Sequence, residues 1–563
     1  MSLSPTSLNQ TNSITVGELI ARFLENCGVK TAFGVISIHN MPILDAFNAR
    51  QKIRFVPARG EAGACNMADA CARISGVVGV CVTSTGTGAG NAAGALIEAL
   101  TAGTPLLHLT GQIESEFVDK NLGFIHEAPA QLAMLQAVGK AAFRISNGAQ
   151  AISVLREAMH IATTAPCGPV SIEIPIDVQG SLVSLPININ DLLPLPVRPL
   201  APQPDAVSRL ATELITAQRP LLWLGGGARH AGAAVQRFIE MGWGVVTSVQ
   251  GRGIVAEDNP ATLGAFNLQK DVEGFYASCD ALLVVGSRLR SNETLSYKLK
   301  LPEKLYRVDV DAAANNRAYP NERFIHGDAL LTLNALADLL EGHSKPKPQF
   351  INDLQAAREA AEKQVDEGLG RYVELKNELN KKTASEPIWW VRDITLSNTM
   401  WGNRSLLLNH PRAGIHALGG GIGQGLAMGI GSAIANTVYG LGRKTIALIG
   451  DGGFILNIGE LACAAQEKTD LIMIVMNDGG YGVIKNIQDA VYGGRRCYVD
   501  LLTPNFAMLC QSMKVKHVSL NKIGDTATIL DNAFAVSGPV VIEVDMNAWG
   551  PFVAKFAGPP KKE

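Results

Sequence analysis

The chain has 563 residues, 47% of them hydrophobic and only 18% charged, with 57 glycines and a formal net charge of −2. This length exceeds what a single hydrophobic core can organise, so we expect about three domains. The composition excludes a disordered or fibrous chain, and the charge balance excludes nucleic acid and anionic membrane surfaces as main partners.

Three further features bear on where the protein works. No apolar run reaches the roughly 18 uncharged residues of a membrane span, and the polar residues 1–12 lack the apolar centre of a signal peptide. The nine cysteines form no C-x-x-C pair, and Cys81 and Cys463 lie in apolar segments. The sequence therefore predicts a cytoplasmic protein with reduced cysteines.

The first third of the chain alternates between strand-like and helix-like segments. Short apolar runs predict strands, and apolar residues three or four positions apart predict helices. We predict strands at residues 31–33, 53–56, 77–83, 105–109 and 168–175, and helices at residues 16–27, 62–75 and about 86–100. This alternation indicates a parallel sheet with helices on both faces.

The middle of the chain repeats the alternation after a break. The Pro-rich stretch 185–204 has no helical period and predicts a linker. Predicted strands then follow at residues 220–224, 243–247, 281–285 and 305–310. The charged, helical segment 345–376 is expected to be a second connector.

Two acidic, glycine-rich clusters end neighbouring predicted strands in the last third. Residues 445–449 run into Gly450-Asp451-Gly452-Gly453, and residues 471–476 run into Asn477-Asp478-Gly479-Gly480. Parallel strands place both clusters at the ligand-binding edge of one sheet. The two carboxylates and the Gly480 carbonyl are the hard oxygen ligands that Mg²⁺ or Ca²⁺ prefers, while the backbone N–H groups of Gly452 and Gly453 suit phosphate. The alternative is a tight strand–helix turn with a chance acid.

This pair of clusters resembles the GDG…NN signature of thiamine diphosphate (ThDP) enzymes, in the superfamily of acetolactate synthase, pyruvate oxidase and benzoylformate decarboxylase. The resemblance implies that Asp451, Asp478 and the Gly480 carbonyl hold Mg²⁺, that Asn477 supports the turn, and that Tyr481 borders the cofactor. Family members usually have Asn where Asp478 stands, which adds a negative charge here.

A second motif resembles the family's R-H-E-x-x-A-x-x-M-A-D stretch. It runs from Arg59-Gly60-Glu61-Ala62 to Met67-Ala68-Asp69, with Gly60 in place of the usual His. By resemblance, Glu61 is the carboxylate that activates the aminopyrimidine ring of ThDP. The alternative is an acid at a helix start, stabilised by the helix dipole.

The resemblance implies further cofactor contacts for residues at the positions where family members bind ThDP. Ile422, between glycines, matches the bulky residue that holds ThDP in its bent shape; otherwise it is a core residue at a helix start. Ser397 and Asn398 stand where relatives contact the diphosphate. Gly86 and Asn91 belong to the family's glycine turn beside the pyrimidine pocket, a turn that on its own could be mere packing.

Three histidines differ in their expected roles. His39, in the loop 34–42, and His126, near the family's F-Q-E segment, are both candidates for acid–base catalysis, since imidazole titrates near neutral pH. The sequence slightly favours His39, and either could instead be a plain hydrogen-bonding loop residue. His108 lies within an apolar strand and is expected to be structural.

The resemblance also implies an architecture. We expect an α/β fold with three doubly wound parallel-sheet domains: pyrimidine-binding (13–185), central Rossmann-like (205–342) and diphosphate/Mg-binding (380–550). The strands 168–175 and 538–545 are close in sequence, which suggests a shared topology for the first and third domains. The central domain carries FAD or ADP in some relatives, and FAD is the less favoured alternative here.

The expected activity is ThDP- and Mg²⁺-dependent cleavage or formation of a bond next to a carbonyl. A 2-oxo acid or related carbonyl substrate would be decarboxylated, and the remaining fragment would be protonated or joined to a second carbonyl compound. The alternatives are an acyl-CoA lyase, a diketone lyase or hydrolase, and a non-catalytic scaffold. We expect a homodimer or homotetramer with its active sites at subunit interfaces.

Overall fold

The computed structural model describes residues 13–185 and 189–558, and the chain divides into two compact units. Unit 1 contains the residues up to Val197 together with Thr437–Gly440, and unit 2 contains the rest. The polar residues 1–12, where no signal peptide is predicted, and positions 186–188 of the predicted linker lie outside the described residues.

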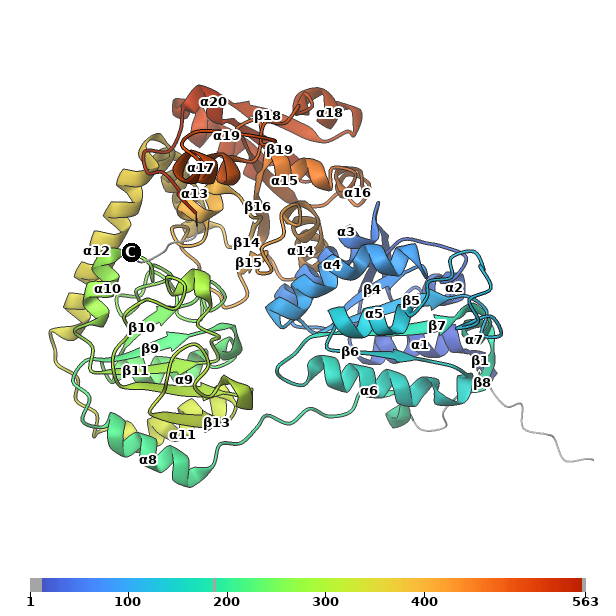
Figure 1. Ribbon diagram of the computed structural model, residues 1–563, viewed down its shortest axis with the longest axis horizontal. Helices are drawn as coiled ribbons and strands as arrows, with labels where there is room; N and C mark the ends of the chain where they lie inside the picture. The colour runs from blue at the N-terminus through green and yellow to red at the C-terminus, as the bar shows by residue number, and fades with distance from the viewer. Residues whose placement is uncertain (1–12, 186–188, 559–563) are drawn as a thin grey trace, which may run out of the picture. The chain divides into compact units, whose positions relative to one another are not determined.

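Unit 1 is built on a parallel sheet with the strand order β3-β2-β4-β5-β7-β6 (Figure 1). Its strands are β2 (Thr31–Gly34), β3 (Arg54–Pro57), β4 (Gly79–Thr83), β5 (Leu106–Gln112), β6 (Ala141–Arg144) and β7 (Pro169–Pro175). Helices α3 (Glu61–Ser75) and α4 (Thr87–Ala102) pack on one face, and α1 (Val16–Asn26) and α6 (Ala151–Thr163) on the other. Shorter elements are β1 (Ser13–Thr15), β8 (Leu182–Ser184), α2 (Met41–Arg50), α5 (Gln131–Val138) and α7 (Ile176–Gly180).

The C-terminal sheet of unit 2 has the same topology. Its order is β15-β14-β16-β17-β19-β18, all parallel, with β14 (Ile388–Arg392), β15 (Gly414–His416), β16 (Lys444–Gly450), β17 (Leu471–Asn477), β18 (Lys516–Leu520) and β19 (Val540–Asp545). In both sheets the sixth strand lies between the fourth and the fifth. The similar segments noticed in the sequence, now β7 and β19, therefore occupy equivalent places. The principal helices here are α14 (Gly425–Tyr439), α15 (Asp451–Leu456), α16 (Glu460–Gln466), α17 (Gly482–Val491), α18 (Phe506–Ser512) and α19 (Thr526–Phe534).

The central sheet of unit 2 is also parallel, with the order β10-β9-β11-β12-β13. Its strands are β9 (Pro220–Leu224), β10 (Gly244–Thr247), β11 (Ala281–Val285), β12 (Leu305–Asp309) and β13 (Arg323–His326), flanked by α8 (Pro204–Leu214), α9 (Gly232–Glu240), α10 (Lys270–Tyr276) and α11 (Ala329–Leu340). The predicted α/β fold with three doubly wound parallel sheets is confirmed.

The segment predicted as a second connector is helical but is not a free linker. It forms α12 (Phe350–Leu369), which is followed by α13 (Val373–Ser385). Phe350 is fully buried and its ring stacks on Phe275 of α10 at 5.5 Å between centroids. This apolar contact fixes α12 against the central domain. The many charged residues of the segment had indicated a solvent-exposed connector instead.

Two local differences from the predictions affect the interpretation of the site. The acidic glycine cluster at 450–453 is not a turn before a later helix, because α15 begins at Asp451 itself. The edge strands β6, β13 and β18 were not predicted. In the part of the chain that the structure describes, no helix combines the length and apolarity needed to cross a membrane.

Candidate active site

Two carboxylates meet at the carboxyl edge of the C-terminal sheet. Asp451 is the first residue of α15, directly after β16, and Asp478 follows β17. These strands are parallel neighbours, with Gly450 paired to Met476. Asp451 is 1% exposed, and its Oδ2 accepts a hydrogen bond of 2.9 Å from the N–H of Gly480. The backbone thus holds the first carboxylate against the second cluster.

The electrostatics of this pair favour a bound cation. Burial, together with the negative charge of Asp478, raises the pKa of Asp451 to about 7, and burial raises the pKa of Asp478 as well. Two facing carboxylates repel when both are ionised, and a divalent cation removes that repulsion. The oxygens of Asp451, Asp478 and the Gly480 carbonyl are ligands that suit Mg²⁺. Among the described residues, no three His, Cys, Asp or Glu side chains lie close enough together to hold a metal ion by themselves.

A network from the neighbouring strands supports the second cluster. The side-chain amide of Asn477 donates to Glu543 Oε1 of β19 at 2.7 Å, and His517 Nε2 of β18 lies 2.8 Å from Glu543 Oε2. Asn477 Oδ1 in turn accepts from the N–H of Gly479 at 3.2 Å. Asn477 therefore braces the turn, and its partners Glu543 and His517 were not found from the sequence.

Gly452 and Gly453 are required by close packing. A Cβ on Gly452 would lie 2.9 Å from the ring of Tyr481, and a Cβ on Gly453 would lie 2.8 Å from Asp393 Oδ2. Tyr481 therefore packs on the first turn of α15, beside the predicted cofactor site.

Asp393, at the end of β14, is a site residue that the sequence interpretation missed. Its Oδ2 accepts the N–H groups of Gly423 and Gly425, each at 3.1 Å. Burial raises its pKa to about 6. These bonds fix the loop that carries Ile422, whose side chain remains 39% exposed.

Ser397 and Asn398 lie between β14 and β15 and are nearly inaccessible. Asn398 begins a π-helical turn, Asn398–Gly402. Within the described structure, the buried Ser397 Oγ and Asn398 Oδ1 have no hydrogen-bond partner. Unsatisfied buried oxygens of this kind are unusual, and a ligand or water would satisfy them.

In unit 1, the glycine turn at the start of α4 contacts the side chain of Glu61 and the backbone of His126. Glu61 is the first residue of α3, and Asn91 Nδ2 donates to its Oε2 at 3.1 Å. A Cβ on Gly88 would lie 3.2 Å from Glu61 Oε1. Gly86 has φ +62°, and a Cβ there would lie 2.4 Å from the carbonyl oxygen of His126. The turn therefore contacts both candidate catalytic residues, Glu61 and His126.

The two candidate histidines lie side by side but differ in exposure. Their ring centroids are 5.1 Å apart, edge to face. His39 is 2% exposed and its Nδ1 has no hydrogen-bond partner in the described structure, whereas His126 is exposed. Burial, with a smaller contribution from His126, lowers the pKa of His39, so His39 is neutral at neutral pH. Solvent and substrate can reach His126 more easily than His39.

Asp69, the last residue of the motif that contains Glu61, has a structural role. Its carboxylate pairs with Arg73, which also bonds Glu98 of α4 at 2.9 Å, and all three side chains are buried. This network joins α3 to α4 beneath the glycine turn. It positions the elements of the site without itself reaching the site.

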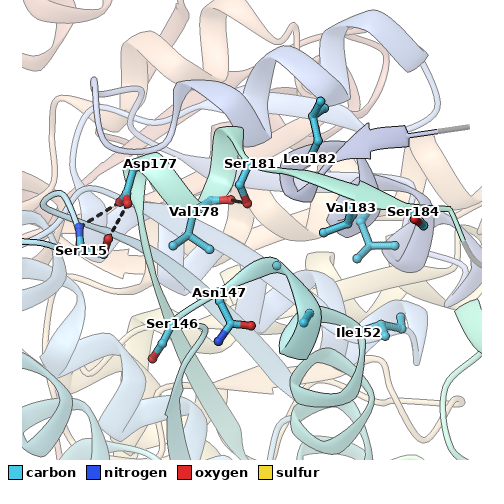
Figure 2. Close-up of a pocket in the computed structure, with 13 residues that line it drawn as sticks. Ser115, Ser146, Asn147, Ile152, Asp177, Val178, Ser181, Leu182, Val183 and Ser184 are labelled. Carbon is cyan, nitrogen blue, oxygen red and sulfur yellow. Dashed lines mark hydrogen bonds between the residues drawn. The ribbon is translucent and has the colours of Figure 1, made fainter. Parts of the chain in front are cut away.

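A separate hollow of about 710 Å³ lies at the β8 end of unit 1 (Figure 2). Its lining includes Asn147, Val183 and Ser115, and the N–H and hydroxyl of Ser115 both bond Asp177. None of the predicted site residues lines it.

Comparison with protein-family models matches all three domains. Residues 14–134 match the thiamine pyrophosphate enzyme N-terminal TPP binding domain, residues 207–336 match the central domain, and residues 397–544 match the C-terminal TPP binding domain. The candidate residues Glu61 and Asp451 therefore lie in the two matched TPP-binding domains.

Curated relatives resemble the chain over nearly its whole length. The probable 2-ketoarginine decarboxylase of Pseudomonas aeruginosa is 29% identical, with 94% of each chain covered. The probable acetolactate synthase large subunit of Methanocaldococcus jannaschii is 27% identical over 94% of this chain and 91% of the relative. The large subunit of acetolactate synthase isozyme 1 of Escherichia coli is 26% identical over 95% of this chain and 94% of the relative.

Proposed function

Because the chain belongs to the thiamine diphosphate-dependent enzymes of the acetolactate synthase, pyruvate oxidase and benzoylformate decarboxylase superfamily, we propose that it uses ThDP and Mg²⁺ to decarboxylate a 2-oxo acid. The fragment left after loss of CO₂ is released or joined to a second carbonyl compound. Bound ThDP supplies the carbon nucleophile and electron sink that this chemistry needs.

The observation that carries the proposal is the pair of facing carboxylates, Asp451 and Asp478, at the sheet edge of the C-terminal TPP-binding domain. They and the Gly480 carbonyl hold Mg²⁺, which binds the diphosphate. The remaining diphosphate and thiazole contacts come from unit 2, namely Ser397, Asn398, Ile422, Gly452, Gly453, Asn477 and Tyr481. The buried, unpartnered oxygens of Ser397 and Asn398 support this assignment.

The ring end of ThDP is assigned to unit 1. Glu61, oriented by Asn91, acts on the aminopyrimidine, with Gly86 lining its pocket. His126 and His39 serve the acid–base steps on the substrate. The family resemblance implies active sites at subunit interfaces, and we therefore propose a homodimer or homotetramer in which two subunits complete each site. We further propose a cytoplasmic location and domains at 13–185, 205–342 and 380–550.

The central domain is proposed to work without FAD. Its glycine loops pack directly on each other, with the N–H of Gly227 donating to the carbonyl of Gly286 at 3.0 Å. A Cβ on Gly225 would lie 2.1 Å from that same carbonyl oxygen. The purified enzyme is expected to lack a flavin absorption band.

Calorimetric titration with ThDP plus Mg²⁺, followed by a substrate panel, tests the proposal. Binding is expected for the wild type, and Asp451→Asn is expected to abolish it. The panel contains short 2-oxo acids, 2-ketoarginine (after the Pseudomonas relative), diketones and CoA thioesters. Release of CO₂ from a 2-oxo acid supports the proposal. Turnover of only diketones or thioesters assigns the alternative lyase activities, and no binding of ThDP contradicts the cofactor assignment.

A further inference from the structure

Lys485 lies unusually close to the second acidic cluster. It stands in the first turn of α17, which begins two residues after Gly480. Its side chain folds back over that turn, so that Nζ donates to the carbonyl oxygens of Asp478 at 3.1 Å and Gly479 at 3.3 Å. The side chain is only 13% exposed, and Nζ lies 3.2 Å from Oδ1 of the exposed Asp500. The ammonium group is therefore fixed over the turn.

The carboxylate of Asp478 occupies the same small volume. A Cβ on Gly482 would lie 2.1 Å from Asp478 Oδ2, and a Cβ on Gly480 would lie 2.8 Å from Lys485 Nζ. Gly482 thus leaves space for the carboxylate of Asp478, and Gly480 leaves space for the ammonium group of Lys485, which bonds the backbone carbonyl of Asp478.

The excess negative charge at this edge of the sheet suggests that Lys485 serves as a counter-charge. Asp451 and Asp478 together carry more negative charge than a cation site with one carboxylate and one amide ligand, and a diphosphate adds more. An ammonium group held over the turn by two carbonyls, with a side chain only 13% exposed, offsets such an excess because solvent screens it less than a fully exposed charge. Arg496 also acts on Asp478, but its guanidinium is 47% exposed and pairs with Asp489 at 2.6 Å. Lys485 is the better-placed counter-charge.

Resting on the cofactor site proposed above, we propose that Lys485 is the fixed counter-charge of Asp478 and determines how tightly the Mg²⁺–diphosphate end of ThDP binds. Lys485 is thus a positioning and affinity residue and takes no part in bond making. The alternatives are that Lys485 contacts the diphosphate itself or only tethers the turn through its hydrogen bonds.

A double-mutant cycle read by calorimetry with ThDP and Mg²⁺ separates these roles. Lys485→Met is expected to weaken binding by about tenfold or more, the scale of losing a buried charge interaction. In the Asp478→Asn background, Lys485→Met is expected to weaken ThDP binding by less than about threefold, because the negative charge that Lys485 balanced is gone. Lys485→Gln keeps hydrogen-bond donors without the charge and should behave like Lys485→Met, while Lys485→Arg should bind nearly as the wild type does.

Controls keep the outcome interpretable. Lys363→Met removes an exposed charge from α12 (side chain 79% exposed) and should leave binding unchanged. Thermal unfolding without ligand verifies that each variant folds. Suppose that the wild type binds ThDP, but Lys485→Met weakens binding equally with Asp478 and with Asn at that position, or Lys485→Gln binds as the wild type does. The counter-charge role is then refuted, and the proposed function stands. If the wild type does not bind ThDP, both fail.

Discussion

At the scale of single residues, the surroundings of Glu61 orient its carboxylate and leave space beside it for a cofactor ring. It begins α3, its Oε2 is anchored by Asn91, and the glycine at position 88 leaves the space beside its Oε1 open. The carboxylate is therefore oriented and still approachable, which is what a proton-transfer partner requires.

We predict that Glu61→Gln binds ThDP and Mg²⁺ normally but loses turnover by about 10²-fold or more, the usual contribution of a general acid–base group. Glutamine keeps the acceptor for Asn91 and removes only the ionisable group. CO₂ release and calorimetry measure the two effects separately. Near-normal turnover would remove Glu61 from the mechanism.

The two histidines differ in exposure, and we propose that the more exposed His126 is the one that acts on the substrate. His39 is buried and neutral, whereas His126 faces solvent. We predict that His126→Gln lowers kcat by about 10²-fold without changing ThDP affinity, and that His39→Gln lowers it less. Steady-state kinetics with the substrate identified by the panel checks this. A larger loss at His39 would show that the buried ring is the one that acts.

At the scale of elements, the contact between α3 and α4 depends on a buried cation between two acids. Removing Arg73 leaves Asp69 and Glu98 buried without their guanidinium partner. We predict that Arg73→Met destabilises the protein by about 3–5 kcal/mol. The matched control Arg22→Met, which breaks a pair that is 31% exposed on α1, should cost at most about 0.5 kcal/mol. Denaturant unfolding compares them, and equal losses would contradict the structural role of the network.

His108 links three strands of the same sheet. Its Nε2 lies 2.9 Å from Thr83 Oγ1 on β4, and its Nδ1 lies 3.0 Å from Ser171 Oγ on β7. Thr83 Oγ1 also donates to the carbonyl of Ser84, so it accepts from Nε2, and a neutral imidazole satisfies both contacts. The structural role expected from the sequence therefore has a geometric basis.

Burial lowers the pKa of His108 to about 4. Because the folded state resists protonation, its contribution to stability is present above the ordinary pKa near 6.5 and is lost as pH falls towards 4. From about pH 7 to about pH 4, the wild type should lose about 3 kcal/mol more unfolding free energy than His108→Gln. Urea unfolding across this range checks the prediction, and parallel pH curves would contradict it.

The sequence predicted most of the buried strands but missed the buried strand β14 and several edge strands. The apolar runs at 445–449 and 471–476 identify β16 and β17 because these strands are covered on both faces. Strands β6, β13 and β18 are short, partly exposed edge strands, so no apolar run marks them.

Site residues were found where a motif marked them and missed where only the fold joins them. Asp393 acts on a loop thirty residues away in the chain, and Glu543 braces Asn477 from β19. Such partners have no fixed spacing in sequence. A carboxylate directly after a buried strand, as at Asp393, is the signal that could have indicated the first of them.

At the scale of the whole molecule, two sheets of identical topology each present acids at one edge. Unit 1 supplies Glu61 and unit 2 supplies Asp451 and Asp478. We propose that one coenzyme joins these groups across two subunits, so that a single chain holds two half-sites.

Mixing two inactive variants tests this claim most directly. Glu61→Gln and Asp451→Asn are each prepared inactive, mixed under conditions that exchange subunits, and assayed for CO₂ release. A mixed dimer contains one site with both substitutions and one with neither, so the mixture should regain up to about a quarter of wild-type activity. Mixed oligomers that form but remain inactive would contradict a site shared between subunits.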